Sequence, residues 1–429
     1  MLSLLRQRNY GLLWFGQVIS VAGDWVLNAS LVFYVYAMTG SVLATGVMFM
    51  IATLPRLLLG SVAGVFVDRW DRWRTMIVSD LLRALLILVL LTVRSPSSIW
   101  IVYLVALVET AIAQFFGPAK SALVPRIVTS EELIKANSLN SLGEEIGRLS
   151  GPAIGGLMLA RLGLPSVVFF DVCSFLFSGA MLALMALPPG AGRPETTPDL
   201  PQSSGPTTPG PRTVIALMAD VWRQWLDGLR VMRRNQVVAS LLLVFAICMV
   251  GEGLLEVLFV PWVKEVMAGD SAMFGWMMSA QAVGSIAGGL ILAAAGKRRA
   301  THRLLILGAA GWGLIDLAIF NVRWLPLSLA LFVLVGLPIA AMFVATSTII
   351  QHEVADAYRG RAFGALATTG ALTTLGGMAI ASAIGQRAGI VPMLNLACLA
   401  VLAGAVVGWV LLIARPTTHK GRRIDDLVR

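Results

Sequence analysis

Residues 41–67 of the chain read SVLATGVMFMIATLPRLLLGSVAGVFV, residues 68–74 read DRWDRWR, and residues 75–93 read TMIVSDLLRALLILVLLTV. Two long apolar runs therefore flank a short loop that carries three arginines, Arg69, Arg72 and Arg74. A helix needs about 20 apolar residues to cross the hydrocarbon core of a bilayer, and both runs come close to that length or exceed it. This stretch predicts two transmembrane helices joined by a basic loop.

The same pattern of apolar runs and polar loops continues along the whole chain. None of the runs shows the alternation of apolar and polar residues that a membrane β-barrel needs. The sequence therefore predicts an all-α integral membrane fold with twelve transmembrane helices. The predicted spans lie at 12–37, 41–67, 75–93, 98–116, 139–160, 165–187, 237–262, 273–295, 304–321, 325–350, 362–386 and 391–414.

The composition excludes an ordinary soluble protein, since 57% of the 429 residues are hydrophobic and only 13% are charged, whereas soluble domains carry about 25% charged residues. The first apolar run is too long for a cleaved signal peptide and contains Asp24, so we interpret it as the first membrane helix. The three cysteines and three histidines are scattered. We therefore expect no metal site, no cofactor and no catalytic centre.

The positions of lysine and arginine predict the orientation in the membrane. With the N-terminus in the cytoplasm, 25 of the 33 basic residues fall in cytoplasmic segments, five at the outer side and three inside spans. Basic residues favour the cytoplasmic side, so both termini are predicted to be cytoplasmic, in a bacterial cytoplasmic membrane. This distribution explains the net charge of +10 without a nucleic-acid partner.

Two sets of six spans are separated by a polar stretch. Residues 1–187 are predicted to form an N-terminal six-helix bundle and residues 236–414 a C-terminal one, followed by a cytoplasmic tail at 415–429. The linker, 188–235, begins rich in proline and ends in an amphipathic segment predicted to lie along the inner interface. Ser61-Val-Ala-Gly64 recurs as Ser285-Ile-Ala-Gly288, each before a basic loop, which indicates pseudo-symmetric halves.

The loop after the second span resembles the signature of the major facilitator superfamily, in which glycine, three residues, Asp-Arg and further basic residues follow one another. The sequence departs from it at Asp71, where the family often has glycine. The resemblance implies a loop that closes the cytoplasmic gate against the start of span eleven, near Arg361. The alternative is that the loop only sets the topology. The matching residues are Gly64, Asp68, Arg69, Arg72 and Arg74.

A second motif in span five resembles the glycine-proline antiporter motif of the superfamily's drug exporters, which implies export. By itself such a motif permits close helix packing. The segment 117–139, together with Asp80 and Arg83, is similar to the macrolide-efflux and enterobactin-exporter branch. Span four has Glu109 where many drug antiporters have arginine, so their arginine relay is not expected here. The motif residues are Gly147, Arg148, Gly151, Pro152, Gly155 and Gly156.

Ten ionisable residues lie inside the predicted spans, where each unpaired charge costs about 2.5 to 3.5 kcal/mol. The resemblance implies a cavity lined by spans 1, 4, 7 and 10. The ten are Asp24, Arg56, Asp80, Arg83, Glu109, Arg148, Asp171, Glu252, Glu256 and Asp316.

Candidate cavity residues follow from helical spacing. Gln17, Asp24 and Asn28 share one stripe of span one, and Glu252 and Glu256 share one face of span seven. We expect these carboxylates and Glu109 to couple transport to protons and to attract cations. The alternative is fixed pairing with Arg56, Arg83 or Arg148. Asp80 and Arg83, three residues apart, are predicted to form a structural or gating pair.

The function that these features favour is export of hydrophobic or cationic small molecules, drugs such as macrolides among them, by proton antiport with alternating access. Three alternatives stay open: an exporter of one native compound such as a siderophore or lysolipid, a membrane enzyme acting on lipid, and a membrane sensor that transports nothing. The dispersed histidines argue against the enzyme. The expected partners are a small-molecule substrate, protons and the lipid bilayer, with the chain as a monomer.

Overall fold

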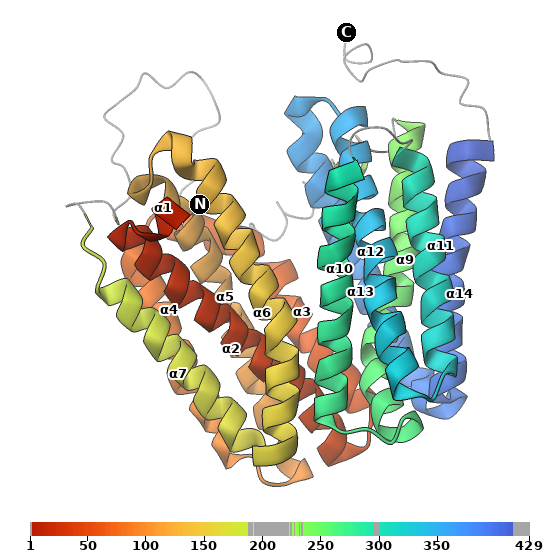
Figure 1. The fold of residues 1–429 in the computed structure, drawn as a ribbon, viewed down its shortest axis with the longest axis horizontal. Helices are drawn as coiled ribbons and strands as arrows, with labels where there is room; N and C mark the ends of the chain where they lie inside the picture. The colour runs from red at the N-terminus through yellow and green to blue at the C-terminus, as the bar shows by residue number, and fades with distance from the viewer. Residues whose placement is uncertain are drawn as a thin grey trace.

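The computed structural model describes residues 2–187, 192, 223, 225–226, 228–230, 232, 235–295 and 301–414, and these are helical without a strand (Figure 1). The predicted tail, 415–429, and most of the predicted linker lie outside the described residues. The first half contains α1 (Leu2–Leu5), α2 (Arg8–Thr39), α3 (Val42–Val67), α4 (Arg72–Ile87), α5 (Ile99–Ile127), α6 (Leu133–Leu162) and α7 (Leu164–Ala183). The second half contains α9 (Gln236–Pro261), α10 (Ser271–Ala295), α11 (Thr301–Asn321), α12 (Leu325–Glu353), α13 (Asp356–Ala388) and α14 (Ile390–Trp409).

Short helical turns extend or connect these helices. The 3-10 turn η1 (Leu88–Thr92) continues α4 toward the outer side, and η2 (Pro96–Ser98) and η3 (Ser130–Glu132) precede α5 and α6. The π-helical turns η4 (Trp262–Val266) and η5 (Val410–Ala414) continue α9 and α14. Gly40 joins α2 to α3 in a tight turn, because its φ of 60° is a conformation in which glycine avoids a Cβ clash.

Twelve long helices cross the molecule, as the sequence predicts, and eleven spans in the described part are apolar enough to cross a membrane by composition. The exception is α6, which is 30 residues long but polar. It packs between α2 of its own half and α10 of the other half, so its small residues are covered by protein, whereas polar residues such as Lys135, Asn137 and Glu144 are exposed. Tertiary packing therefore accounts for the span that hydropathy does not detect.

The two halves repeat one arrangement of helices. In the first half, neighbours in space follow the order α3, α5, α4, α7, α2, α6, and in the second half the order is α10, α12, α11, α14, α9, α13. Each position in one series corresponds to the helix six spans later in the other. The halves meet where α6 packs on α10 and α3 packs on α13, two pseudo-equivalent joints. The predicted pseudo-symmetry is therefore present in the packing order.

The polar contacts between the halves in the described part of the chain lie at the outer ends of the helices. Ser271 Oγ donates to the Gly156 carbonyl over 2.8 Å, and Gln386 Nε2 donates to the Gly40 carbonyl over 3.3 Å. At the cytoplasmic ends, Gly64 of α3 and Gly360 and Gly364 of α13 face open space. The bundles also diverge toward the end where α1 and the end of α14 lie (Figure 1). The described residues thus adopt an inward-facing arrangement.

The described part of the predicted amphipathic segment packs on the C-terminal half. Trp225 Nε1 donates to Thr369 Oγ1 of α13 over 3.2 Å. Gly228 lies against the backbone of Arg361, while Arg223 is exposed. Met232 is fully buried in the hydrophobic core. The described side chains of this segment thus contact protein, and its position along the inner membrane interface stays a prediction.

Candidate functional site

A buried ion cluster links three helices of the N-terminal half near their midpoints. Arg83 of α4 donates through Nη2 to Asp24 Oδ1 of α2 over 2.5 Å, and through Nε to Glu109 Oε1 of α5 over 2.7 Å. A further contact joins Arg83 Nη2 to the same Glu109 oxygen. The guanidinium also lies 4.1 Å from the centre of the Phe175 ring of α7. Arg83 therefore holds four helices together, and sequence reasoning missed Phe175 because its partner is distant in the chain.

The two carboxylates of this cluster differ in exposure. The side chain of Glu109 is 8% exposed, whereas that of Asp24 is 27% exposed. Asn28 donates through Nδ2 to the backbone carbonyl of Asp24 over 2.8 Å and so stays beside it. Gln17 lies apart in a small space between α2 and α6, beside Trp14 and Glu144. The structure thus brings Asp24, Asn28 and Glu109 together but separates Gln17 from them.

Asp80 and Arg83 make no direct hydrogen bond or ion pair with each other among the described residues, although Arg83 lies within electrostatic range of Asp80, and their role as a structural or gating pair stays a prediction. Asp80 is fully buried and neither of its carboxylate oxygens has a hydrogen-bond partner in the described part of the chain. Arg83 turns instead toward α2 and α5, since two carboxylates converge there. Three residues of separation bring two side chains near one face of a helix, but the better acceptors across the helix interface determine the partner.

Asp171 of α7 adds another buried carboxyl group beside the cluster. Its Oδ1 accepts a hydrogen bond from Ser174 Oγ over 2.9 Å, and it packs against Gly23, next to Asp24. Its Oδ2 has no partner among the described residues. The guanidinium of Arg83 therefore lies among four carboxyl groups, those of Asp24, Asp80, Glu109 and Asp171. The N-terminal half would bury net negative charge if all four were ionised.

The carboxylates of the C-terminal half are arranged differently. Glu252 and Glu256 on α9 are partly exposed, and neither has a hydrogen bond or ion pair with another described residue. Arg56 of α3 is exposed and lies within electrostatic range of Glu256 and of Asp24. Asp316 of α11 is buried and accepts a hydrogen bond from Trp312 Nε1 over 2.8 Å. Arg56 thus stands between the charged groups of the two halves.

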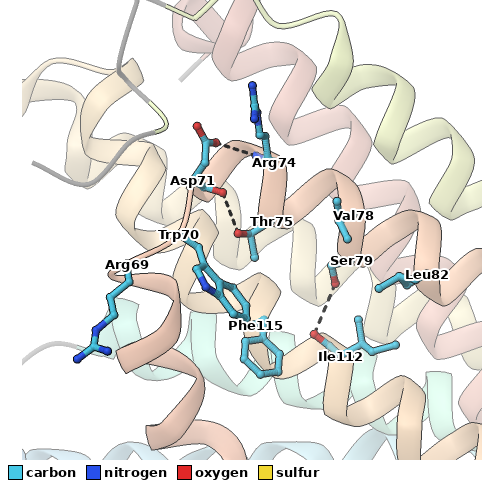
Figure 2. Close-up of a pocket in the computed structure, with 10 residues that line it drawn as sticks. All are labelled: Arg69, Trp70, Asp71, Arg74, Thr75, Val78, Ser79, Leu82, Ile112 and Phe115. Atoms are coloured by element: carbon cyan, nitrogen blue, oxygen red, sulfur yellow. Dashed lines mark hydrogen bonds between the residues drawn. The ribbon is translucent and has the colours of Figure 1, made fainter. Parts of the chain in front are cut away.

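The residues of the predicted gate loop surround the start of α4 (Figure 2). Asp71 caps this helix, since its Oδ1 accepts from the Arg74 backbone N–H over 2.9 Å. Thr75 Oγ1 donates to the Asp71 carbonyl over 2.8 Å. This cap explains why the chain has an aspartate at position 71, where the family often has glycine. Arg361 stacks on Tyr358, 5.6 Å from its ring centre, and has no hydrogen bond or ion pair with the loop among the described residues.

The glycines of the predicted antiporter motif lie against two neighbouring helices. A Cβ added at Gly147 would lie 2.7 Å from Val21 Cγ1 of α2, and one at Gly151 or Gly155 would clash with α2 as well. One at Gly156 would clash with the Ser271 carbonyl of α10. Pro152 is buried, and its carbonyl lies against Gly275 of α10. Arg148 pairs with Glu145 over 2.8 Å on the same helix, so it does not neutralise the cavity carboxylates.

Contacts at the outer ends include residues that the sequence did not single out. Tyr36 of α2 donates its hydroxyl to Glu265 of the α9–α10 connection. Lys264 donates to the Ala37 carbonyl over 3.2 Å and lies 5.7 Å from the centre of the Tyr36 ring. No local pattern marks these residues, because each pair is more than 220 positions apart. Within the described residues, no group of three or more His, Cys, Asp or Glu side chains is placed to hold a metal ion.

Comparison with known proteins gives one consistent result. Residues 13–267 and 241–426 match the family model of the Major Facilitator Superfamily. Macrolide efflux protein A of Streptococcus pyogenes is 24% identical over 386 residues, which cover 88% of this chain and 89% of that protein. The multidrug efflux pump Tap of Mycolicibacterium fortuitum is 26% identical over 416 residues, which cover 91% and 94%. The crystal structure of a bacterial homologue of the iron transporter ferroportin, in an inward-facing state, matches with a TM-score of 0.71 at 16% identity, covering 94% of this chain and 98% of that one.

Proposed function

Because this chain belongs to the Major Facilitator Superfamily of membrane transporters, we propose that it exports small hydrophobic or cationic molecules in exchange for protons. It is a multi-pass transporter of the cytoplasmic membrane and not an enzyme. The relatives named as macrolide and multidrug efflux proteins favour export over import. The identity of the substrate and the coupling to protons are the parts that need an experiment.

The observation that carries the proposal is the shared guanidinium of Arg83. Its Nη2 lies between Asp24 and Glu109, and Asp24 is the more exposed of the two carboxylates. A proton that reaches Asp24 from the cytoplasmic opening cancels its charge, so Arg83 keeps Glu109 as its ionic partner. When the proton leaves, Asp24 again offers a negative charge to Arg83 or to a cationic substrate. Competition of this kind between a proton and a cation is what antiport requires.

Glu252 and Glu256 extend the same chemistry to the opposite half. They have no fixed partner in the described residues, and Arg56 is within electrostatic range of Glu256. Unpaired carboxylates inside a membrane protein mark an ion or substrate pathway by default. We assign them the role of attracting the cationic substrate, while Asp24 exchanges the proton.

Alternating access requires the outer contacts to break while the cytoplasmic ends close. The pair between Tyr36 and Glu265, and the hydrogen bond from Ser271 to Gly156, hold the outer ends together in this arrangement. Closure would bring the loop that contains Asp68 and Arg69 toward the start of α13. The gate residues and the antiporter-motif glycines are assigned these roles as part of the same proposal.

The test is uptake of ethidium into inside-out vesicles that carry an imposed pH gradient, acidic inside. Wild type should accumulate ethidium, whereas Asp24→Asn should lose gradient-driven uptake by at least about ten-fold. Glu252→Gln and Glu256→Gln should weaken it. Glu131→Gln is the matched control, because Glu131 is an exposed carboxylate outside the membrane spans. Exchange of ethidium without a gradient should persist in Asp24→Asn if that residue serves coupling.

The outcomes separate the proposals. Gradient-driven uptake that survives in Asp24→Asn would refute the assignment of Asp24 and leave it as a structural ion pair. Uptake by wild type that ignores the gradient would refute proton coupling. No uptake by well-folded wild type would refute broad export of cations and would favour an exporter of one native compound.

A further inference from the structure

A groove on the surface of the N-terminal half lies apart from the ion cluster. The α3–α4 loop, α4 and α5 line it, and it has a volume of about 640 Å³ (Figure 2). Its floor is apolar and includes Val78, Leu82, Ile112 and Phe115. Neither the proposed transport cycle nor the gate explains an apolar groove at this place.

The groove faces the lipid phase. Among the described elements, α4 packs chiefly on α5 and α7 of its own half, so its opposite face points away from the protein. Along that face Val78 is 51% exposed and Leu82 is 48% exposed. The groove lies at the cytoplasmic ends of these helices, beside the basic loop. Acyl chains of the cytoplasmic leaflet therefore contact this surface.

A second apolar groove continues the first one toward the middle of the membrane. It has a volume of about 390 Å³ and runs between α3 and α5, past Leu58 and Val108. Ile112 and Phe115 line both grooves. The continuous apolar track gives an acyl chain a path along the protein, from the level of the headgroups inward.

The mouth of the groove carries positive charge at the level of the headgroups. Arg69 and Arg74 are exposed, and neither guanidinium has a hydrogen bond or ion pair with another described residue. Asp71 also lies at the mouth, but its carboxylate already accepts the Arg74 backbone N–H. Between the arginines, Trp70 stacks on Phe115 with 5.6 Å between ring centres (Figure 2). An aromatic ring at the interface and basic side chains around an apolar groove fit a phospholipid headgroup.

We propose that this groove binds an anionic phospholipid of the cytoplasmic leaflet. The headgroup lies at the mouth, where Arg69 and Arg74 flank Trp70 with side chains that point apart (Figure 2), so that either arginine can turn toward the phosphate, and one acyl chain follows Val78, Leu82 and Phe115. A lipophilic cation does not suit the mouth, because two arginines would repel it. A zwitterionic lipid brings no net charge to pair with them.

Native mass spectrometry of the purified full chain tests this proposal. The protein is titrated with phosphatidylglycerol and, separately, with phosphatidylcholine of the same acyl chains. Wild type should bind one phosphatidylglycerol more tightly than phosphatidylcholine. The double variant Arg69→Gln with Arg74→Gln should weaken this binding about thirty-fold, on the expectation of about 1 kcal/mol for each of the two basic side chains near an anionic headgroup. Arg94→Gln is the charge control, because Arg94 is exposed at the outer end of the same span.

A second pair of variants tests the groove without changing charge. Leu82→Trp fills it, whereas Leu85→Trp adds the same ring at a more exposed position of α4 outside it, where the side chain is 66% exposed. Only Leu82→Trp should reduce binding of phosphatidylglycerol. Equal binding of the two lipids by wild type, or unchanged binding in both the double arginine variant and Leu82→Trp, would overturn the proposal. So would loss of ethidium binding in Leu82→Trp with unchanged lipid binding, because the groove would then admit substrate.

Discussion

In the N-terminal half, Arg83 joins Asp24 and Glu109 across α2, α4 and α5, whereas in the C-terminal half Glu252 and Glu256 share one face of α9 without a described partner. The helices of the two halves nevertheless follow the same packing order. The comparison teaches that a repeated backbone arrangement does not impose repeated chemistry. The first half uses charge to hold helices together, and the second leaves two carboxylates without a described partner, which we propose attract the substrate.

The largest effect should come from removing the cation of the N-terminal cluster. Arg83→Gln leaves Asp24 and Glu109 without a counter-ion in a site where Arg83 is 5% exposed. Breaking a buried ion pair from one side costs about 3–5 kcal/mol. We expect a large fall in thermal stability in detergent, measured by the melting transition of the purified protein.

A double variant sharpens this prediction. Arg83→Gln combined with Glu109→Gln removes one charge of each sign, so it should recover part of the lost stability. If the double variant is as unstable as the sum of the two single variants, the cluster does not stabilise the N-terminal half in the way we infer.

The next effect concerns the two joints between the halves. Gly156→Ala would press a Cβ onto the Ser271 backbone carbonyl, whereas Gly46→Ala would meet the hydroxyl of Ser382. Overpacking costs about 1–3 kcal/mol when the neighbour cannot move. We expect Gly156→Ala to lower both the melting temperature and transport more than Gly46→Ala does. Gly289→Ala is the control, because nothing lies within 4 Å of an added Cβ there.

Removing the hydroxyl of Ser382 tests whether a side-chain clash at one joint and a backbone clash at the other explain the different effects of the two glycine variants. Ser382→Ala in the Gly46→Ala background should restore part of the packing at the α3–α13 joint, since it removes the hydroxyl that clashes with the added Cβ and leaves only the Ser382 Cβ at 2.9 Å. Failure of this rescue, or equal damage at both joints, would show that the backbone contact at Gly156 is not the cause.

A smaller effect, of the opposite sign to that of Arg83, should come from the C-terminal carboxylates. Glu252 and Glu256 lie four residues apart, where like charges destabilise a helix by about 0.2–0.5 kcal/mol. Glu252→Gln should leave the melting temperature equal to that of wild type or slightly higher, while ethidium uptake falls. A melting temperature that drops as in Arg83→Gln would mean that the second half also depends on a fixed ion pair.

The smallest effect is a pH dependence at the cytoplasmic edge of the N-terminal half. Gln7 Nε2 donates to Glu132 Oε1 over 2.8 Å, and together with the backbone N–H of Thr129 it lowers the pKa of Glu132. A carboxyl group with a depressed native pKa stabilises the fold above its ordinary pKa of about 4.3. That contribution disappears as the pH falls through the native pKa. Melting curves from pH 7 to pH 3 should show a slightly steeper loss for wild type than for Glu132→Gln.

Much of the fold could be predicted from the sequence. The apolar runs and the basic loops identified twelve spans and cytoplasmic termini, because a bilayer admits few ways to bury a polar backbone. The candidate site was predicted less completely. Asp24, Glu109, Glu252 and Glu256 stand out as carboxylates inside spans, but the partner of Asp24 and Glu109 comes from another helix, and Glu252 and Glu256 have no partner among the described residues. The direct contacts of Arg83 with Asp24 and Glu109 could not be predicted for that reason, since local spacing cannot weigh acceptors supplied by α2 and α5.

The sequence by itself determined that this protein is a twelve-helix membrane protein with its basic loops in the cytoplasm. Hydropathy and charge act on each segment separately, so those properties can be read without knowing which segments touch. Only the tertiary structure decided that Arg83 serves Asp24 and Glu109, that Tyr36 meets Glu265, and that the halves join at their outer ends. These contacts join residues 26 to 229 positions apart, and their geometry depends on how the helices pack.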